Sequence, residues 1–456
     1  MSIFTALTNA YSLEDAFKAK DITSRKMKTA IEEWFRLYYE EEATKESDSC
    51  QRIAPTIVSK LTKTCFGEYQ ASSKDEFAQS VLKSLGDCKR EAMQMLLVGG
   101  ETFVKPVPDA GKLIFRLVRR DQVLIFGRDA DGAPCDIGTF ERSTLGSKYY
   151  TLLERRSIGM DGRLTIRNKL YCSHMEGQLG QPVPLGTLER YAALLPEYTY
   201  PAPMGGLGLV HMQVPIENVV DGSQDGVSVY AAAVGLIRNI NRNEAQINGE
   251  FERGESRIVV SSAMTGVGSD GKRKLVDNVF IGVDGDPEDI GVTIFSPDLR
   301  IQQFHERKRE YLRNVESVIG IKRGLLSEVE AQERTAKEVT SSEGDYNLTI
   351  IDLQEVWTKA VKDTVKLCGS LGQLYKIPGA HDVPEDAVSL DWGNGILYDE
   401  DKTWADYLDM VARGLIKPEI ALGWRFGMPT ETEADLAKIR AKYMPVLDEM
   451  AEGGEE

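Results

Sequence analysis

The chain has 456 residues, enough for two or three domains, and a formal net charge of −16. Such an acidic composition argues against a protein that grips nucleic acid over a broad surface, because that affinity comes largely from Lys and Arg neutralising phosphates. The six cysteines are scattered without a C-x-x-C pair, and no apolar stretch approaches about 18 residues. We therefore expect no disulfide framework, zinc site, secretory signal or membrane span, and a protein made and used in a cytoplasm.

Helical periodicity dominates the N-terminal part of the chain and then gives way to alternation. Apolar residues recur at helical spacing over 12–45, 52–64 and 74–98, and the last run ends at Gly99 and Gly100. Short runs of β-branched and aromatic residues follow, broken by Asp-Gly turns. These runs cover 101–107, 112–119, 123–127, 137–141, 149–157 and 163–172. They predict an antiparallel β region, and together with the helices an α+β fold.

A long helix is predicted to begin behind Asp221 and Asp225, whose oxygens can accept the amide hydrogens of a first turn, and to end at Gly254. Its apolar positions form a narrow stripe, and the remaining face is mostly Asn, Arg, Glu and Gln. Because such a stripe buries itself poorly within one chain, we expect part of it to contact neighbouring subunits. The stripe consists of Tyr230, Val234, Ile237, Ile240, Ile247 and Phe251, and the intersubunit candidates are Ile240, Ile247 and Phe251.

A short excursion with strand-like runs and a basic cluster follows this helix. Gly- and Asp-rich turns separate the runs, as expected of a small β structure. The runs cover 257–261, 275–283 and 291–296, and the basic cluster is Lys272, Arg273 and Lys274.

Two further helices follow the excursion. The first is predicted to begin at Ser296 and Pro297, a cap residue followed by proline at the first helical position, and to end at Gly320. Thr335 then opens a capping box and a helix predicted to run to Cys368. From residue 385 onward, 17 Asp and Glu stand against 7 Lys and Arg, so the C-terminal part is acidic. It is predicted to contain a strand at 387–391 and helices at 402–413, 417–425 and 431–444.

The glycine-rich stretch 266–272 is the strongest candidate for chemistry. It fits G-x-G-x-x-G and nearly fits the phosphate-binding loop, but Arg273 stands where that loop has a magnesium-binding hydroxyl. The residues after it resemble a strand, whereas a phosphate loop leads into a helix. A hairpin is therefore the favoured interpretation, and a nucleotide-binding loop the alternative. The acidic loop 284–289 fits a solvated turn better than a calcium site.

The chain resembles the portal proteins of tailed bacteriophages. The resemblance spans nearly the whole chain, and it is carried by the order of several short motifs. At one position this chain departs from the pattern, because Lys337 stands where a small or polar residue is expected. The motifs are Gly99-Gly-Glu-Thr-Phe-Val-Lys-Pro106, Val214-Pro-Ile-Glu-Asn218 leading into Gly226-Val-Ser-Val-Tyr230, Thr335-Ala-Lys-Glu-Val339, and Met410-Val-Ala-Arg-Gly-Leu-Ile416.

The resemblance implies a portal fold with five kinds of segment. A helical and β-stranded wing carries a stem of two helices, a small β-containing clip, a tunnel loop and a helical crown. The wing would comprise 1–223 and 335–395, the stem 224–254 and 297–319, the clip 255–296, the tunnel loop 320–334, and the crown 396–456.

The resemblance also implies a function. Portal proteins form a ring, usually dodecameric, at one capsid vertex of the virion, after assembly in the host cytoplasm. Double-stranded DNA passes through the ring without sequence specificity during packaging and ejection. The implied partners are the terminase, the head-completion or tail adaptor, and the major capsid and scaffolding proteins. The implied chain performs no catalysis and carries no cofactor, no metal and no membrane segment.

The implied sites lie on the tunnel loop and the clip. Gly320 and Gly324 are expected to let the loop move, its cations to touch phosphates transiently, and its carboxylates to limit how firmly DNA is held. The basic clip cluster Lys272, Arg273 and Lys274 is the candidate for terminase docking. The tunnel-loop candidates are Lys322, Arg323, Leu325, Leu326, Glu328 and Glu330.

Two other classes of function remain open. One is a nucleotide-dependent DNA-processing enzyme that uses the loop 266–272, and the other is a phage or host adaptor without DNA contact. The enzyme would need a helix after Lys272 and a second acidic strand motif, and the sequence offers neither. The adaptor has no compositional signature, and the order of the portal-like motifs favours the ring over it.

Overall fold

The computed structural model describes residues 10–39, 49–253, 257–260, 265–267, 273–275, 292–295, 300–327, 336–393, 400–430 and 432–444. It is 48% helical and 23% strand, a mixture compatible with the predicted α+β class. The chain divides into two compact units. The larger comprises Met1–Gly67 and Ala71–Leu390, and the smaller comprises Glu68–Gln70 and Asp391–Glu456. No helix within the described ranges is long and apolar enough to cross a membrane.

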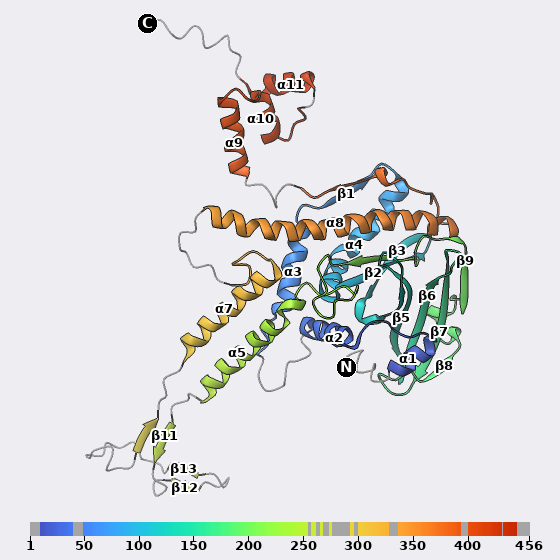
Figure 1. Ribbon diagram of the computed structural model, residues 1–456, viewed down its shortest axis with the longest axis vertical. Coiled ribbons are helices and arrows are strands. Elements are labelled where there is room, and N and C mark those ends of the chain that lie inside the picture. Colours follow the sequence, from blue (N-terminus) through green and yellow to red (C-terminus); the bar gives the residue numbers. More distant parts are fainter. Residues whose placement is uncertain are drawn as a thin grey trace. The chain divides into compact units, whose positions relative to one another are not determined.

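Among the described residues, four helices come first in the larger unit (Figure 1). The single helix predicted over 12–45 is interrupted, because the chain leaves helical geometry at Lys18, which has a φ of 56°; residues 40–45 lie outside the described part. The predicted stop at the glycine pair is confirmed, since Gly100 caps the fourth helix with a φ of 77°. The helices are α1 (Ala10–Phe17), α2 (Arg25–Tyr39), α3 (Ile53–Cys65) and α4 (Glu76–Gly99).

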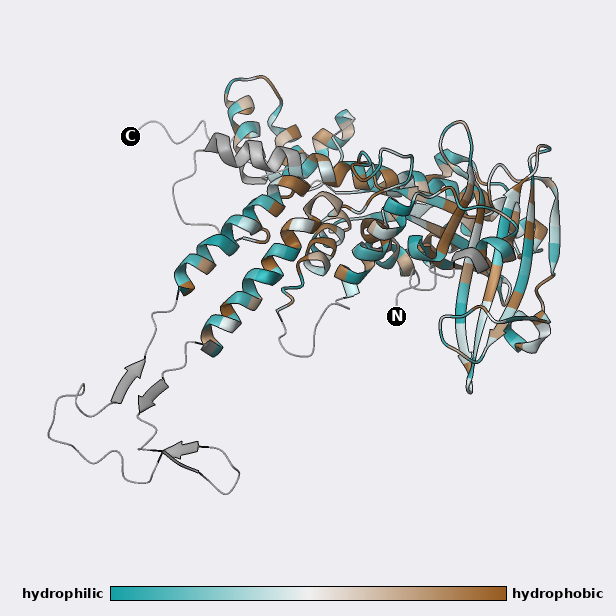
Figure 2. Cartoon of the chain, turned by 60° about the horizontal axis from the view of Figure 1, so that its bottom comes forward, coloured by the Kyte–Doolittle hydropathy of each residue, from teal (hydrophilic) through white to brown (hydrophobic). Residues whose placement is uncertain are grey.

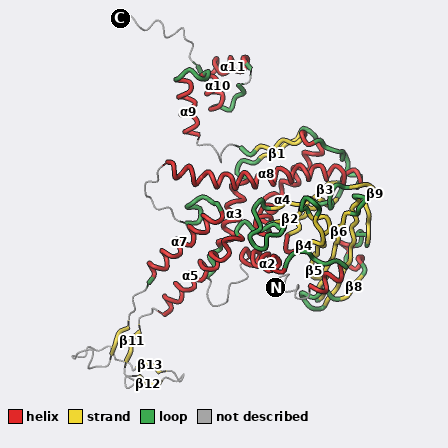
Figure 3. The backbone as a smooth tube through the Cα atoms, in the orientation of Figure 1, coloured by secondary structure: helices red, strands yellow, loops and turns green. Residues whose placement is uncertain are grey.

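The predicted antiparallel β region is confirmed and forms two sheets (Figure 3). One sheet has the strand order β10-β2-β3, and the other has the order β4-β5-β6-β7-β8, with β9 also paired to β7. Every pairing in both sheets is antiparallel. The strands are β2 (Glu101–Asp109), β3 (Lys112–Arg119), β4 (Val123–Arg128), β5 (Pro134–Leu145), β6 (Lys148–Ile158), β7 (Arg163–Ser173), β8 (Gln181–Val183), β9 (Glu197–Pro203) and β10 (Val210–Gln213).

A long helix, α8 (Ala336–Leu374), contributes to the core beside these sheets. It continues past the predicted end at Cys368, and its Leu371 packs in a cluster with Phe103 and Ile137 of the two sheets. Trp357 of the same helix is fully buried and meets the ring of Phe66 edge-on, with ring centroids 5.3 Å apart. The stability of the larger unit therefore depends on burial of apolar groups from segments that lie far apart in the sequence.

Two antiparallel helices, α5 (Val234–Arg253) and α7 (Ile301–Ile319), bracket the excursion and form what we call the helix pair. The first begins later than predicted, because 221–230 is not helical and a single 3-10 turn, Ala231–Ala233, precedes it. The second has its N-cap at Arg300, so the start predicted at Ser296 is wrong; residues 296–299 lie outside the described part. Its predicted stop at Gly320 is confirmed.

Four short strands of the excursion are described. β11 (Arg257–Val260) pairs with β14 (Val292–Phe295), which confirms the predicted strands at 257–261 and 291–296. β12 (Thr265–Val267) pairs with β13 (Arg273–Leu275). The predicted strand 275–283 shares only Leu275 with β13, and its remaining residues, like the acidic loop 284–289, lie outside the described part.

The smaller unit contains α9 (Glu400–Ala412), α10 (Pro418–Arg425) and α11 (Glu433–Tyr443), close to the three predicted helices. Trp404 and Trp424 stack with ring centroids 6.4 Å apart, and Arg440 bonds the carboxylate of Glu419 at 2.6 Å. The longer segment of this unit begins at Asp391, and the resemblance implied a crown that begins at 396. The predicted strand before it is present as β15 (Val388–Asp391), which pairs with β1 (Gln70–Ser73).

Candidate functional site

The helix pair leaves the β region through the segment 214–230, which lies against the C-terminal end of α4. Val229 N and Ser228 Oγ both donate to the carbonyl of Leu97, each at 3.0 Å. Tyr230, predicted to lie on the helical stripe, is fully buried, and its hydroxyl donates to the carbonyl of Trp34 at 2.8 Å. These bonds hold the backbone before α5 in a non-helical path, which explains why the helix begins after Tyr230.

A buried group of charges, the ionic cluster, fixes the same segment. It consists of Glu101, Arg120, Arg128, His211 and Asp225. Arg128 Nη2 donates to Glu101 Oε1 at 2.9 Å and to Asp225 Oδ1 at 2.7 Å, while Arg120 Nε lies 3.1 Å from Glu101 Oε2. Asp225 was expected to cap a helix, and instead it is a partner in this cluster. Buried charges are tolerated when they are paired with opposite charges in this way, although Glu101 Oε2 and Arg120 Nε make no hydrogen bond to the described residues.

The ionisation of Glu101 reflects these neighbours. Complete burial favours the neutral acid, but His211 and the guanidinium groups of Arg120 and Arg128 more than offset it, and they hold the pKa of Glu101 well below its ordinary value. Its Oε1 also accepts the backbone amide of Gly226 at 3.0 Å. One carboxylate therefore ties β2, the segment before α5 and two arginines together.

Two glycines let the backbones cross closely at this point. A Cβ on Gly100 would lie 2.4 Å from the backbone of Gly226 and Val227, and a Cβ on Gly226 would lie 2.5 Å from the carbonyl oxygen of Gly100. Gly100 also has a positive φ, which other residues rarely adopt. Only glycine fits at both positions, so the two backbones are in direct contact where the β region leads into the helix pair.

The seam of the helix pair is sealed within this chain. Ile237, Ile240, Asn243 and Ile247 of α5 are buried at helical spacing, and Asn243 Nδ2 donates to the carbonyl of Phe304 at 2.9 Å. Of the three residues expected to contact a neighbouring subunit, Ile240 and Ile247 are 0% and 5% exposed, so they face the interior of their own subunit. Phe251 is 51% exposed, and the expectation remains open for it alone.

Charged and polar side chains join the helices outside this seam. Lys308 Nζ bonds Glu244 Oε2 at 2.8 Å and Gln51 Oε1 at 2.6 Å, and Arg300 meets Glu250 at 3.1 Å near the far end. Figure 2 shows hydrophilic residues over most of both helices. Eleven of the 19 residues of α7 are exposed, among them Arg307, Glu310 and Arg313. Within the described part of the chain, one broad and mostly polar face of α7 is thus left uncovered.

Residues 320–327, which we call the anchored turn, follow α7 directly. Glu316 is fully buried, and its carboxylate accepts the backbone amides of Gly324, Leu326 and Ser327 at 3.1, 2.6 and 2.9 Å. The hydroxyl of Ser327 adds a fourth bond at 2.7 Å. These bonds restrain the backbone of 324–327, a part of the predicted tunnel loop in which Gly320 and Gly324 were expected to permit movement.

The predicted tunnel-loop residues differ in their exposure, and two of them are not described. Lys322 and Arg323 are exposed, whereas Leu325 and Leu326 are half-buried. Glu328 and Glu330 lie outside the described residues.

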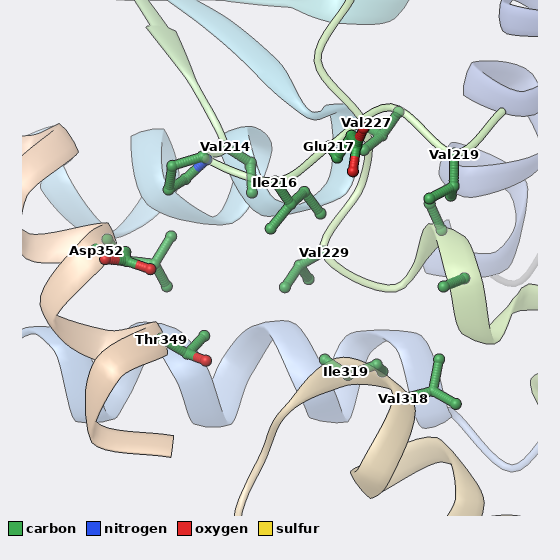
Figure 4. Close-up of a pocket in the computed structure, with 14 residues that line it drawn as sticks. Val214, Ile216, Glu217, Val219, Val227, Val229, Val318, Ile319, Thr349 and Asp352 are labelled. Atoms are coloured by element: carbon green, nitrogen blue, oxygen red, sulfur yellow. The ribbon is translucent and has the colours of Figure 1, made fainter. Parts of the chain in front are cut away.

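An open cavity of about 260 Å³ lies beside the end of α7. Figure 4 shows Val214, Ile216 and Val229 of the segment before α5 on one side, and Val318 and Thr349 of α7 and α8 on the other. Its lining is mostly apolar, with carboxylates of Glu217 and Asp352 at the wall.

The strands on either side of the glycine stretch 266–272 pair with each other, and its residues 268–272 lie outside the described part. β12 and β13 pair in antiparallel fashion on either side of 268–272, and residue 273 begins a strand where a phosphate loop would have a helix. Arg273 and Lys274 lie on β13, and Lys272 lies outside the described residues. Among the described residues, no group of three or more His, Cys, Asp and Glu is placed to hold a metal ion.

Sequence reasoning missed the buried ionic residues. Glu101 lies in the portal-like motif 99–106, and Asp225 was predicted to cap a helix. Both carboxylates pair with Arg128, and this pairing forms only when the fold brings β2, β4 and the segment before α5 together. Glu316 was not singled out from the sequence. A signal existed for it, because a glutamate in the last turn of a helix opposes the helix dipole and therefore calls for local donors.

Comparison with known proteins gives remote structural likeness only. No protein-family model matches the chain, and no curated protein matches its sequence. One solved chain, from the neck of a native GTA particle computed with C12 symmetry, aligns at 13% identity and a TM-score of 0.46, covering 90% of this chain and 96% of that one. Another, from the neck of an empty GTA particle computed with C6 symmetry, aligns at 14% identity and a TM-score of 0.49, covering 91% and 98%. Likeness at this level leaves the function to be argued from the residues of this chain.

Proposed function

We propose that this chain is the subunit of a portal-like ring, a channel for double-stranded DNA at one vertex of a virus-like capsid. The observation that carries the proposal is the helix pair: its seam is closed within the subunit, its base is locked to the β region, and yet α7 leaves 11 of its 19 residues uncovered. A projecting pair with one broad polar face suits a ring, in which that face meets neighbours or a water-filled channel.

The charge of the chain fits a channel through which DNA slides better than a protein that binds DNA tightly. The net charge of −16 disfavours tight adhesion of a polyanion, because few phosphates can be neutralised. Exposed cations such as Arg307, Arg313 and Arg323 nevertheless supply scattered contacts. DNA held by few and weak contacts can slide, which is what packaging and ejection require.

The remaining assignments follow from the same proposal. The N-terminal helices and β region with α8 form the wing, the helix pair forms the stem, and the excursion forms the clip. The basic cluster Lys272, Arg273 and Lys274 of the clip docks the terminase and later a tail adaptor, while the smaller unit forms the crown. The ring is a dodecamer with no enzymatic activity of its own, and ATP hydrolysis belongs to the terminase.

The nucleotide-dependent enzyme remains the second candidate, and the hairpin speaks against it. Phosphate-binding loops use the N-terminus of a following helix, and here a strand follows the glycine stretch. Lys272 would also lack the neighbouring hydroxyl that binds magnesium, because residue 273 is arginine.

Imaging of the purified chain by negative-stain microscopy tests the proposal, with ATP turnover measured on the same sample. We expect rings with a central hole and no turnover. Dispersed monomers together with turnover that Lys272→Ala abolishes would establish the enzyme and refute the ring.

A further inference from the structure

The anchored turn is attached at both ends and presents two cations between the attachments. Ile321 and Ser327 are buried, and the amide of Ile321 donates to the carbonyl of Glu316 at 3.0 Å. Lys322 and Arg323 lie between these points and are exposed. From the other side, Lys60 Nζ of α3 donates to the carbonyl of Leu325 at 2.5 Å.

The Glu316 carboxylate determines the shape of this turn. A buried carboxylate is costly unless several donors satisfy it, and hydrogen bonds to a charged group are worth roughly 1.5–3 kcal/mol each. Four donors from Gly324, Leu326 and Ser327 converge on this one group. Removing the carboxylate leaves three backbone amides without their hydrogen-bond acceptor. The turn then loses the interactions that stabilise its conformation.

We propose that Glu316 is a positioning residue, which holds Lys322 and Arg323 at a fixed place against the phosphates of DNA in the channel. This inference rests on the proposed function. A fixed pair of cations loses little conformational entropy on each contact, so a brief contact with a passing phosphate needs no reordering of the loop. Lys322 and Arg323 thus contact the phosphates, and the buried carboxylate of Glu316 supports the turn that carries them.

Limited trypsin digestion of the purified chain tests the support without any DNA. Trypsin cleaves after Lys322 and Arg323 only when the turn opens, and loss of even one charge-assisted bond is expected to speed cleavage there at least about tenfold. We expect this acceleration in Glu316→Ala and none in Glu355→Ala, an exposed glutamate of α8 that serves as the matched control. Equal cleavage in Glu316→Ala and the wild type overturns the positioning role.

Two milder variants keep the test decisive if Glu316→Ala does not fold. Glu316→Gln keeps the shape of the side chain and loses its charge, and Ser327→Ala removes only the hydroxyl bond. Both should retain the thermal transition of the wild type and show faster cleavage after Arg323, with the larger effect in Glu316→Gln. Unchanged cleavage in both variants overturns the role.

A second experiment separates the DNA contact from the support. Particles are assembled with Lys322→Ala/Arg323→Ala or with Glu316→Gln, and nuclease-protected genome is measured. We expect rings in both variants and less protected genome than in wild type. Protection at the wild-type level in both, with faster cleavage confirmed for Glu316→Gln, would mean that the turn is anchored but contacts no DNA. Absence of rings in the wild type would instead refute the proposed function and leave the digestion result standing.

Discussion

The two ends of the helix pair are held in opposite ways. At the base, Glu101 and Asp225 are buried among arginines, and Gly100 crosses Gly226 backbone against backbone. At the far end, Phe251 is half exposed, and the ion pair of Arg300 with Glu250 has an arginine side chain that is 68% exposed. Exposed ion pairs contribute little to stability, whereas buried networks are lost only at high cost.

This difference indicates where the subunit is complete and where it is not. At the base, the buried charges of the ionic cluster are paired with opposite charges of the same chain. The far end combines an exposed aromatic ring with weak ion pairs, and neighbouring subunits of a ring would supply what it lacks. In the proposed ring, the base would be the fixed point of the subunit, and the far end would be a surface for assembly.

Breaking the base should have the largest effect. Glu101→Ala leaves Arg120 and Arg128 sharing the single buried carboxylate of Asp225, and loss of one partner of a buried network costs about 3–5 kcal/mol of unfolding free energy. Urea denaturation measures it. Glu197→Ala is the control, since it breaks the exposed pair with Arg167 and should cost less than about 1 kcal/mol. Equal losses in the two variants would contradict a special role for the base.

The effect of Glu101→Ala should also depend on pH. Because the pKa of Glu101 is lowered in the folded protein, its ionised form stabilises the fold above the ordinary glutamate pKa of 4.5, and this contribution is lost as the pH falls below that value. The stability gap between wild type and variant should therefore narrow in acid. A gap that stays constant from neutral pH down to about pH 3 would show that the charge is not its source.

The seam and the exposed end of α5 should respond differently to the same kind of substitution. Ile247→Ala removes buried methyl groups and should cost about 2–4 kcal/mol in subunit stability. Phe251→Ala, one turn further, should leave the thermal transition of the subunit within about 1 °C, because its ring is half exposed, and should weaken ring assembly. Analytical ultracentrifugation and calorimetry separate the two readouts. A destabilised subunit with intact rings in Phe251→Ala would place that ring inside the subunit.

The glycine crossing can be tested with a matched pair of variants. Gly100→Ala and Gly111→Ala both place alanine at a positive φ, of 77° and 78°, but only the first Cβ would meet backbone atoms, since Gly111 has open space. Backbone strain of about 1–3 kcal/mol is common to both, so the difference between them measures the crossing. We expect Gly100→Ala to be the less stable by at least about 1 kcal/mol in urea denaturation.

The smallest effect is expected at the far end of the pair. Arg300→Ala removes an exposed ion pair with Glu250 and should change the unfolding free energy by less than about 1 kcal/mol, with the remaining effect screened at high salt. Measurement at low and high ionic strength checks this. A loss as large as that of Glu101→Ala would remove the contrast between the two ends.

Much of this architecture could be predicted from local sequence patterns. The glycine pair after 74–98 marked a helix end, alternation marked the antiparallel strands, and Gly320 marked the end of α7. The predictions failed where distant residues decide the local structure. Asp225 has the chemistry of a helix cap but pairs with Arg128, and Ile247 lies on a narrow stripe but is buried within its own chain.

The loop after α7 shows the same limit. Its two glycines suggested freedom of movement, and only the fold shows that the carboxylate of Glu316 binds the backbone of 324–327. The sequence shows that residue 316 is a glutamate, but its burial depends on how residues 320–327 fold back over the end of α7. Sequence patterns therefore predict the elements well and their long-range partners poorly.

In the proposed ring, copies of the same chain complete the far end and the uncovered face of α7. Mass photometry of the purified protein measures this assembly. We expect one dominant ring species, at about twelve times the 50.7 kDa mass of the chain if the ring is dodecameric. A single species at the monomer mass under assembly conditions would contradict it.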